Sequence, residues 1–96
     1  MRIAAVYPAN REIKEKIAAK HGLEFSQIIE VFINQEYRPL IVRSRQEIRS
    51  RWRYAALGRS FSGKYITVIF VMERNSVARV ITARSMSSAE KKRYRL

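Results

Sequence analysis

Arginine supplies most of the groups in this sequence that can act on another molecule. Fourteen of the twenty basic residues are arginines, and the chain has a formal net charge of +12. Residues 38–96 hold fifteen basic residues against three glutamates, whereas residues 1–37 hold five of each. A guanidinium group stays charged and binds phosphate through a planar fork of donors. We therefore predict a polyanion partner for the later part of the chain, most simply RNA.

The other residue types limit the reactions that are open to the chain. It has no aspartate, no cysteine, one histidine and eight glutamates, which disfavours a two-metal nuclease or a zinc site. Its three glycines form no phosphate-binding loop. RNA can still be cleaved without a metal, because its own 2′-hydroxyl attacks the adjacent phosphorus when a proton acceptor, a proton donor and cations are supplied. We expect no metal and no small-molecule cofactor.

Arginines alternate with aromatic residues in the later part of the chain, as is typical of surfaces that bind nucleic acid. The predicted contacts are Arg51, Arg53, Arg59, Arg74, Arg79 and Arg84, interleaved with Trp52, Tyr54 and Tyr65. A basic tail with Lys91, Lys92 and Tyr94 is a second predicted contact, with RNA or with a protein partner. The alternative is that the aromatic rings belong to the core and the arginines to a solvated face.

Two helices are predicted before the arginine-rich segments. Asn10 can cap a helix over residues 11–21, in which apolar residues recur at a spacing of four, and Gly22 can end it. A second amphipathic helix is predicted over residues 25–33. Near the end of the chain, Ser87 and Glu90 form a capping box that opens a short basic helix.

The segments between these helices have the character of strands. They are residues 40–43, 51–58, 65–72 and 77–82, joined by short turns, while residues 3–7 fit an edge strand or an extended arm. The pattern predicts an α+β fold: a mainly antiparallel sheet of four to five strands, with two N-terminal helices and a short C-terminal helix packed on one face. We expect one domain over residues 1–96. The apolar stretch near the start is too short for a signal peptide or a membrane span, so we expect a cytoplasmic protein.

Three short motifs follow one another along the chain. They are Lys20-His21-Gly22, then Arg53-Tyr54-Ala55-Ala56-Leu57-Gly58, then Arg79-Val80-Ile81-Thr82-Ala83-Arg84. Their order and spacing resemble the BrnT family of toxins from bacterial type II toxin–antitoxin modules. The resemblance implies a RelE-like fold, an activity that cuts RNA and halts translation, and a BrnA-like ribbon-helix-helix antitoxin from a neighbouring gene. Residues 9–13 and Ile17 depart from the family pattern, and Met72 stands where the family has threonine.

Four residues are predicted to take part in catalysis. His21 belongs to the residue type best suited to carry a proton near neutral pH, and Lys20, Arg79 and Arg84 are predicted to stabilise charge on the phosphate. His21 has the alternative of interacting with the negative end of a helix dipole. Arg79 and Arg84 fall on opposite sides of a regular strand, so both reach one site only if the chain bends.

Three functions are compatible with these residues. The leading hypothesis is a metal-independent endoribonuclease toxin, and its rival is a non-catalytic nucleic-acid-binding or regulatory protein derived from such a toxin. A scaffold or ribosome-associated protein would follow from the basic charge alone.

Overall fold

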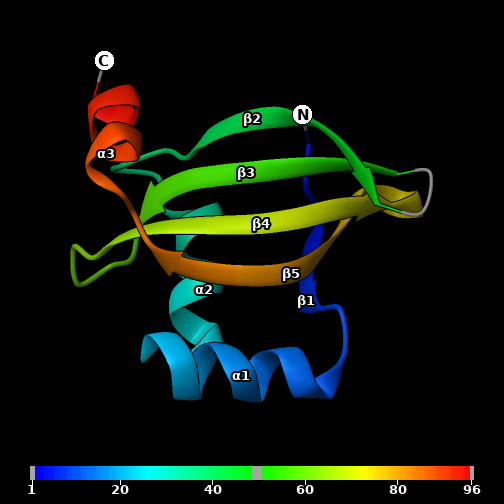
Figure 1. The fold of residues 1–96 in the computed structure, drawn as a ribbon. Helices are drawn as coiled ribbons and strands as arrows, with labels where there is room; N and C mark the ends of the chain where they lie inside the picture. The colour runs from blue at the N-terminus through cyan, green and yellow to red at the C-terminus, as the bar shows by residue number, and fades with distance from the viewer. Residues whose placement is uncertain (1, 49–50, 96) are drawn as a thin grey trace.

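A five-stranded sheet in the order β1-β5-β4-β3-β2 runs through the molecule (Figure 1). The computed structural model describes residues 2–48 and 51–95. The strands are β1 (Ala5–Pro8), β2 (Leu40–Ile48), β3 (Arg51–Arg59), β4 (Tyr65–Glu73) and β5 (Val77–Ser85). The helices are α1 (Arg11–His21), α2 (Phe25–Ile33) and α3 (Ser88–Arg95), with the 3-10 turn η1 (Arg74–Ser76) between β4 and β5. The predicted α+β class is confirmed.

Strands β2 to β5 pair in antiparallel fashion, as their short connections predict. The predicted strands are too short at their ends, because β2 continues to Ile48 and β5 to Ser85. The residues beyond the predicted ends include polar ones, which a strand can hold because one face of an antiparallel sheet can face water. The first segment is an edge strand rather than an extended arm: β1 pairs parallel to β5, with Ala5 opposite Val77.

The first two helices have the predicted bounds, because local capping groups set them. The Asn10 side-chain oxygen accepts a hydrogen bond from the Ile13 N–H at 3.0 Å. At the other end of α1, Gly22 has a left-handed φ of 64° and its N–H donates to the Ala18 carbonyl. A further cap starts α2, where the Glu24 N–H donates to the Gln27 side-chain oxygen at 3.0 Å.

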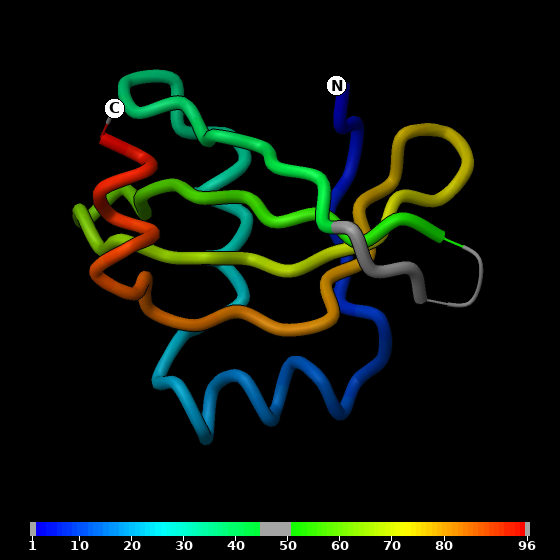
Figure 2. Tube along the Cα trace, turned by 45° about the horizontal axis from the view of Figure 1, so that its top comes forward, coloured from blue at the N-terminus to red at the C-terminus, as the bar shows by residue number. Residues whose placement is uncertain are grey.

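The core lies between the sheet and the two N-terminal helices, and α2 crosses behind the sheet in both views (Figure 1, Figure 2). Its largest fully buried side chain is Phe70 of β4. The Phe70 ring stacks on Tyr54 at 5.6 Å and meets Phe32 of α2 edge-on at 5.3 Å. Tyr54 therefore packs against the core, and its predicted place on a nucleic-acid surface is wrong.

The helix layer lies close to the sheet where β3 passes under α2. A Cβ atom added at Gly58 would lie 2.7 Å from Cγ1 of Val31, which is fully buried on α2. Any larger residue at this position forces the helix away from the strand, since cores are close-packed. Gly58 thus sets the separation of the two layers.

A β-bulge interrupts the pairing of β5 with β4. Ile69 pairs with Thr82 and Phe70 with Val80, so Ile81 is an extra residue on β5. An extra residue shifts the alternation of side chains by one position. Before the bulge, the odd-numbered residues of β5 face one side of the sheet. After the bulge, the even-numbered residues face that same side.

The C-terminal helix does not follow the prediction that all helices pack on one face. Figure 2 shows α3 at the end of the sheet where β5 leaves it. Its Glu90 bonds to Thr67 and Arg84, whose side chains project from the face opposite α1 and α2. None of the α3 side chains that the structure describes is buried, so this helix is held by polar contacts and by the edge of the Tyr94 ring against Tyr65. Over residues 2–48 and 51–95, no helix has the length and apolar character to cross a membrane.

Candidate nucleic-acid interface

The sheet face opposite α1 and α2, here called the open face, carries most of the predicted arginines. Residues paired directly across neighbouring strands project to the same side. The pairs that define the open face are Arg53 with Val71, Arg59 with Tyr65, Arg79 with Val71, and Arg84 with Thr67. The bulge at Ile81 places Arg79 and Arg84 on the same side of the sheet, whereas on a regular strand they would face opposite sides. They nevertheless occupy different clusters.

The first cluster, called the Glu73 cluster, consists of Tyr7, Arg51, Glu73 and Arg79. Arg79 donates from Nε to one carboxylate oxygen of Glu73, and Arg51 approaches the other at 3.3 Å. The Arg79 guanidinium also lies 5.1 Å from the ring centroid of Tyr7. The hydrogen bond from Arg79 is the main cause that lowers the pKa of Glu73, with Arg51 acting in the same direction. Glu73 is therefore ionised at neutral pH.

A hollow of about 570 Å³ adjoins this cluster. Its lining joins three of the four cluster residues to the start of α1, namely Ala9, Asn10, Ile13, Arg51, Val71, Glu73, Arg79 and Ile81. Two guanidinium groups, one carboxylate and an apolar wall thus meet at one concavity. Cations that hold a phosphate beside a proton acceptor are the elements that metal-free RNA cleavage needs.

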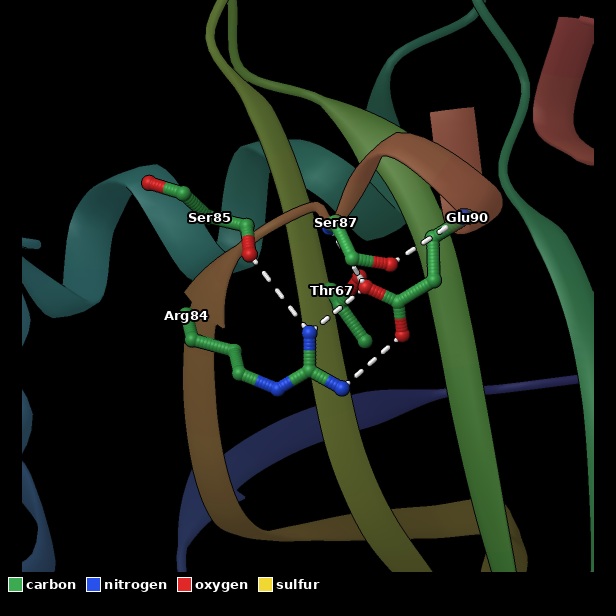
Figure 3. Close-up of polar contacts among 5 residues, drawn as sticks. All are labelled: Thr67, Arg84, Ser85, Ser87 and Glu90. Carbon is green, nitrogen blue, oxygen red and sulfur yellow. Dashed lines mark hydrogen bonds and ion pairs between the residues drawn. The ribbon is translucent and has the colours of Figure 1, made fainter. Parts of the chain in front are cut away.

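The second cluster, called the Glu90 cluster, joins α3 to the sheet (Figure 3). Arg84 contacts the Glu90 carboxylate with both terminal nitrogens, at 2.5 and 2.9 Å. Thr67 donates to the same carboxylate at 3.0 Å, and the Ser87 N–H donates to it at 2.8 Å. These bonds, led by that of Arg84, lower the pKa of Glu90 to about 2. The predicted capping box of Ser87 and Glu90 is present, since the Glu90 N–H donates to Ser87 Oγ at 3.2 Å.

The third cluster, called the tyrosine pocket, lies beside α3 and is lined by Tyr37, Arg38, Arg59, Tyr65, Tyr94 and Arg95. The guanidinium carbon of Arg59 lies 4.0 Å from the ring centroid of Tyr37 and 4.9 Å from that of Tyr65. Tyr94 meets Tyr65 edge-on at 6.3 Å, and its hydroxyl donates to the Arg38 carbonyl at 3.3 Å. Burial raises the pKa of Tyr94.

The two residues predicted on α1 lie away from the Glu73 cluster. Lys20 and His21 form the last turn of α1, whereas Asn10, which lines the hollow, precedes its first turn. A rise of 1.5 Å per residue separates the two ends by roughly 15 Å. The structure therefore does not place His21 and Arg79 at one concavity.

The remaining predicted contacts are distributed over the open face and its ends. Arg53 is half-buried on β3, Arg74 is exposed in η1, and Lys91 and Lys92 are exposed on α3. The Lys91 ammonium lies 5.5 Å from the Tyr65 ring centroid, which attaches it to the rim of the tyrosine pocket. Trp52 stacks with Arg43 at 4.5 Å and shares its side of β3 with the core residue Tyr54.

Sequence reasoning did not assign a role to Glu73, Tyr7 or Tyr37. Glu73 carried a usable signal, because it is one of only three glutamates in residues 38–96. An isolated carboxylate among many arginines is expected to pair with some of them. Tyr7 and Tyr37 carried no such signal, since each meets its arginine only through pairings between distant segments.

A family described as the ribonuclease toxin BrnT of type II toxin–antitoxin systems matches residues 10–90 of the chain. Among solved structures, the crystal structure of the Brucella abortus ribonuclease toxin BrnT matches with a TM-score of 0.60 and 23% identity. That match covers 91% of this chain and 100% of the Brucella chain, and it supports the same fold. No curated protein matches the sequence.

Proposed function

This chain belongs to the BrnT family of ribonuclease toxins from type II toxin–antitoxin systems, and we propose that it cleaves RNA on its open face without a metal ion and so inhibits translation. Membership implies RNA as the substrate and a protein antitoxin as a partner. The observation that supports the proposed reaction most directly is the Glu73 cluster, where a carboxylate and two guanidinium groups border one hollow.

The groups in this cluster match the steps of metal-free cleavage. Arg79 and Arg51 hold the non-bridging phosphate oxygens, and Glu73 accepts the proton of the 2′-hydroxyl as its oxygen attacks phosphorus. The bond from phosphorus to the 5′-oxygen breaks, and the Tyr7 hydroxyl supplies the proton to that oxygen. The products are a 2′,3′-cyclic phosphate and a free 5′-hydroxyl, so no external co-reactant is needed.

The other predicted residues receive binding or positioning roles in this proposal. Arg53, Arg59, Arg74, Lys91, Lys92 and Tyr94 contact the RNA on either side of the reaction centre. Arg84 positions α3 through Glu90 instead of contacting the scissile phosphate, because both terminal nitrogens of its guanidinium are already engaged by that carboxylate. Lys20 and His21 would contact the RNA only where the strand reaches the C-terminal end of α1, away from the Glu73 cluster.

An assay of RNA cleavage in excess chelator tests the proposed reaction and the choice of residues together. We expect the wild-type protein to release products with a cyclic phosphate, and Arg79→Ala to lower the rate by about 100-fold. His21→Ala serves as the matched comparison, and we expect a change within about threefold, as for ordinary surface substitutions. A large loss with His21→Ala and none with Arg79→Ala would move the reaction centre to the end of α1.

A non-catalytic role is the second candidate, and the ion pairs on the open face favour it. Arg79 contacts Glu73 and Arg84 contacts Glu90 before any RNA is present. Paired arginines offer less net charge to a phosphate than solvated ones do. If wild-type protein binds RNA but releases no product under any condition of the same assay, this second function replaces the first.

We also propose that the protein partner is the BrnA-like ribbon-helix-helix antitoxin expected from a neighbouring gene, and that both act in the cytoplasm. The charge of +12 suits a partner with an acidic contact segment. Co-expression of the two genes followed by co-purification checks the pairing. Cleavage by the purified chain should stop when the purified antitoxin is added in equimolar amount.

A further inference from the structure

The geometry points to the tyrosine pocket as a subsite that binds one unpaired nucleobase of the RNA together with an adjacent phosphate. This inference rests on the proposed function in taking RNA as the ligand, but it does not depend on cleavage. It concerns a part of the open face that is separate from the Glu73 cluster.

Charge distinguishes this pocket from the other two arginine clusters. Arg79 and Arg84 each contact a glutamate, whereas the lining of the tyrosine pocket contains three arginines, three tyrosines and no carboxylate. Lys91 adds a fourth cation beside the Tyr65 ring. Among the described residues, this is therefore the concavity on the open face where positive charge meets aromatic rings without a bound acid. An anion can bind there without first displacing a glutamate.

The central arginine of the pocket is held in place before any ligand arrives. Arg59 lies between Tyr37 and Tyr65, at 4.0 and 4.9 Å from the two ring centroids. A Cβ atom at Gly63 would lie 3.1 Å from an Arg59 terminal nitrogen, so the glycine leaves room for the guanidinium group. The Arg59 Nε is buried without a hydrogen-bond partner among the described residues. An oriented guanidinium loses less conformational entropy on binding than a mobile one.

Asn34 fixes the loop that carries Tyr37. Its side-chain amide donates to the Arg59 carbonyl at 3.0 Å, and its side-chain oxygen accepts from the Tyr37 N–H at 3.0 Å. Asn34 is itself buried, so these two bonds are shielded from water. The loop after α2 and the end of β3 are thereby joined, and Tyr37 is held against Arg59 while 42% of its surface stays exposed.

The size of the pocket suits a nucleobase. Its volume of about 440 Å³ falls in the range of small-molecule sites, roughly 300–1,000 Å³. Aromatic rings and guanidinium planes stack on bases of any sequence. A base inside a duplex keeps its faces covered by its neighbours, so this mode of binding selects single-stranded segments, loops and ends. Arg38 and Arg95 at the rim can then contact the phosphate of the stacked nucleotide.

The test uses binding instead of cleavage, so that the two proposals fail separately. A short single-stranded RNA with 2′-O-methyl groups cannot undergo attack by its 2′-oxygen, and one 2-aminopurine in it reports stacking by loss of fluorescence. The affinity and quenching are measured for the wild-type protein, Tyr37→Leu and Tyr37→Trp. Trp52→Leu is the matched control, because Trp52 is an exposed ring that stacks with Arg43 on the side of β3 opposite the open face.

We expect Tyr37→Leu to weaken single-strand binding about tenfold and to abolish the quenching, as the loss of one stacked base predicts. Tyr37→Trp should restore both readouts, and Trp52→Leu should resemble the wild-type protein. The same RNA annealed to its complement should bind equally to the wild-type protein and to Tyr37→Leu. Such a pattern supports the subsite even if the wild-type protein cleaves no RNA, an outcome that would reject only the proposed reaction.

Two results would overturn the subsite. One is wild-type affinity and quenching in Tyr37→Leu, and the other is an equal loss of affinity for single-stranded and duplex RNA. If Tyr37→Leu leaves RNA binding unchanged and instead weakens binding of the purified antitoxin, the pocket belongs to the protein partner. Circular dichroism of each variant confirms that the comparison is between folded proteins.

Discussion

Two glutamates give the arginines of the open face different roles. Glu73 lies beside a hollow and contacts two arginines, so its carboxylate is placed where a phosphate can replace or join it. Glu90 instead accepts bonds from a threonine, an arginine and a backbone N–H, which fill its acceptor sites. Glu73 keeps acceptor sites that can take a proton, so it can react. Glu90 has its acceptor sites occupied, so it holds α3 in place.

Glu73→Gln tests whether Glu73 accepts a proton or only pairs with arginine. The substitution removes a negative charge from the open face, so we expect RNA to bind more tightly, by roughly two- to fivefold at low salt. If Glu73 is the proton acceptor, the cleavage rate should nevertheless fall by about 100-fold or more. Affinity is measured on uncleavable RNA and rate on cleavable RNA. A variant that binds tighter and cleaves as fast as the wild-type protein would leave Glu73 with an ion-pairing role alone.

Some residues of these clusters follow from the sequence and others do not. The capping groups Asn10, Ser87 and Glu90 were predictable because each bonds within three residues of itself. The contact of Arg59 with Tyr37 was not, since it joins β3 to a loop through the buried Asn34. Local hydrogen bonds are encoded by short spacing, whereas contacts across the sheet depend on a register that the sequence does not display.

Among the elements, α3 makes few contacts with the sheet, and the Glu90 carboxylate accepts most of the hydrogen bonds that join the two. None of its described side chains is buried, so little apolar surface holds it against the sheet. Arg84 and Thr67 of the open face bind it through Glu90 (Figure 3). The position of the tyrosine pocket follows from this attachment, because α3 contributes Tyr94 and Arg95 to its lining.

Glu90→Gln should therefore destabilise the protein in a pH-dependent way. At neutral pH we expect a loss of about 1 kcal/mol, the upper range for a pair in which Arg84 stays 41% exposed, and a drop in Tm of roughly 4–8 °C. The folded-state pKa of Glu90 is about 2 against an ordinary 4.5, so the wild-type contribution is complete above pH 4.5 and is lost as pH falls toward 2. The Tm difference between the two proteins should shrink over that interval.

Glu15→Gln provides the control for this experiment. Glu15 is exposed on α1, and the substitution makes the same change in charge without removing a described contact with the sheet. Its Tm should match that of the wild-type protein within about 2 °C at neutral pH. A Glu90→Gln deficit that stays constant from pH 7 to pH 2 would mean that the ion pair does not hold α3.

Most of the elements were predictable from the sequence, but the bulge in β5 was not. Helices α1 and α2 both begin at capping residues, and α1 ends at Gly22, so periodicity and capping groups define most of their ends. The bulge in β5 left no trace, because Val80, Ile81 and Thr82 are all good strand formers and any of them can be the extra residue. Only pairing with β4 selects Ile81. Arg79 and Arg84 therefore project from the same face, although the alternation of a regular strand places them on opposite faces.

For the whole molecule, the division of charge along the sequence becomes a division between two faces. Residues 1–37, with equal numbers of basic and acidic residues, supply the edge strand β1 and both helices of the covered side. The later residues, with fifteen basic against three acidic, supply strands β2 to β5 and α3. The covered side carries the helices with balanced charge, and the arginine clusters of the open face make it the face predicted to bind a polyanion.

A matched pair of lysine substitutions tests this division. Lys91→Gln changes an exposed residue of α3 at the open face, and Lys14→Gln changes an exposed residue of α1 on the covered side. Each phosphate contact adds about 0.7 to the slope of log affinity against log salt for single-stranded nucleic acid. We expect Lys91→Gln to lower the slope by roughly that amount and Lys14→Gln to leave it unchanged, as measured by titration of uncleavable RNA at several salt concentrations.

The comparison is informative because the two variants have the same net charge as each other. If the total charge of the protein governed binding, both would weaken it equally, since each loses one positive charge. A difference in slope arises only where the lysine lies near enough to the strand to release a condensed counterion. Equal slopes for Lys91→Gln and Lys14→Gln would mean that RNA does not lie along the open face, and both the proposed reaction centre and the tyrosine pocket would then be misplaced.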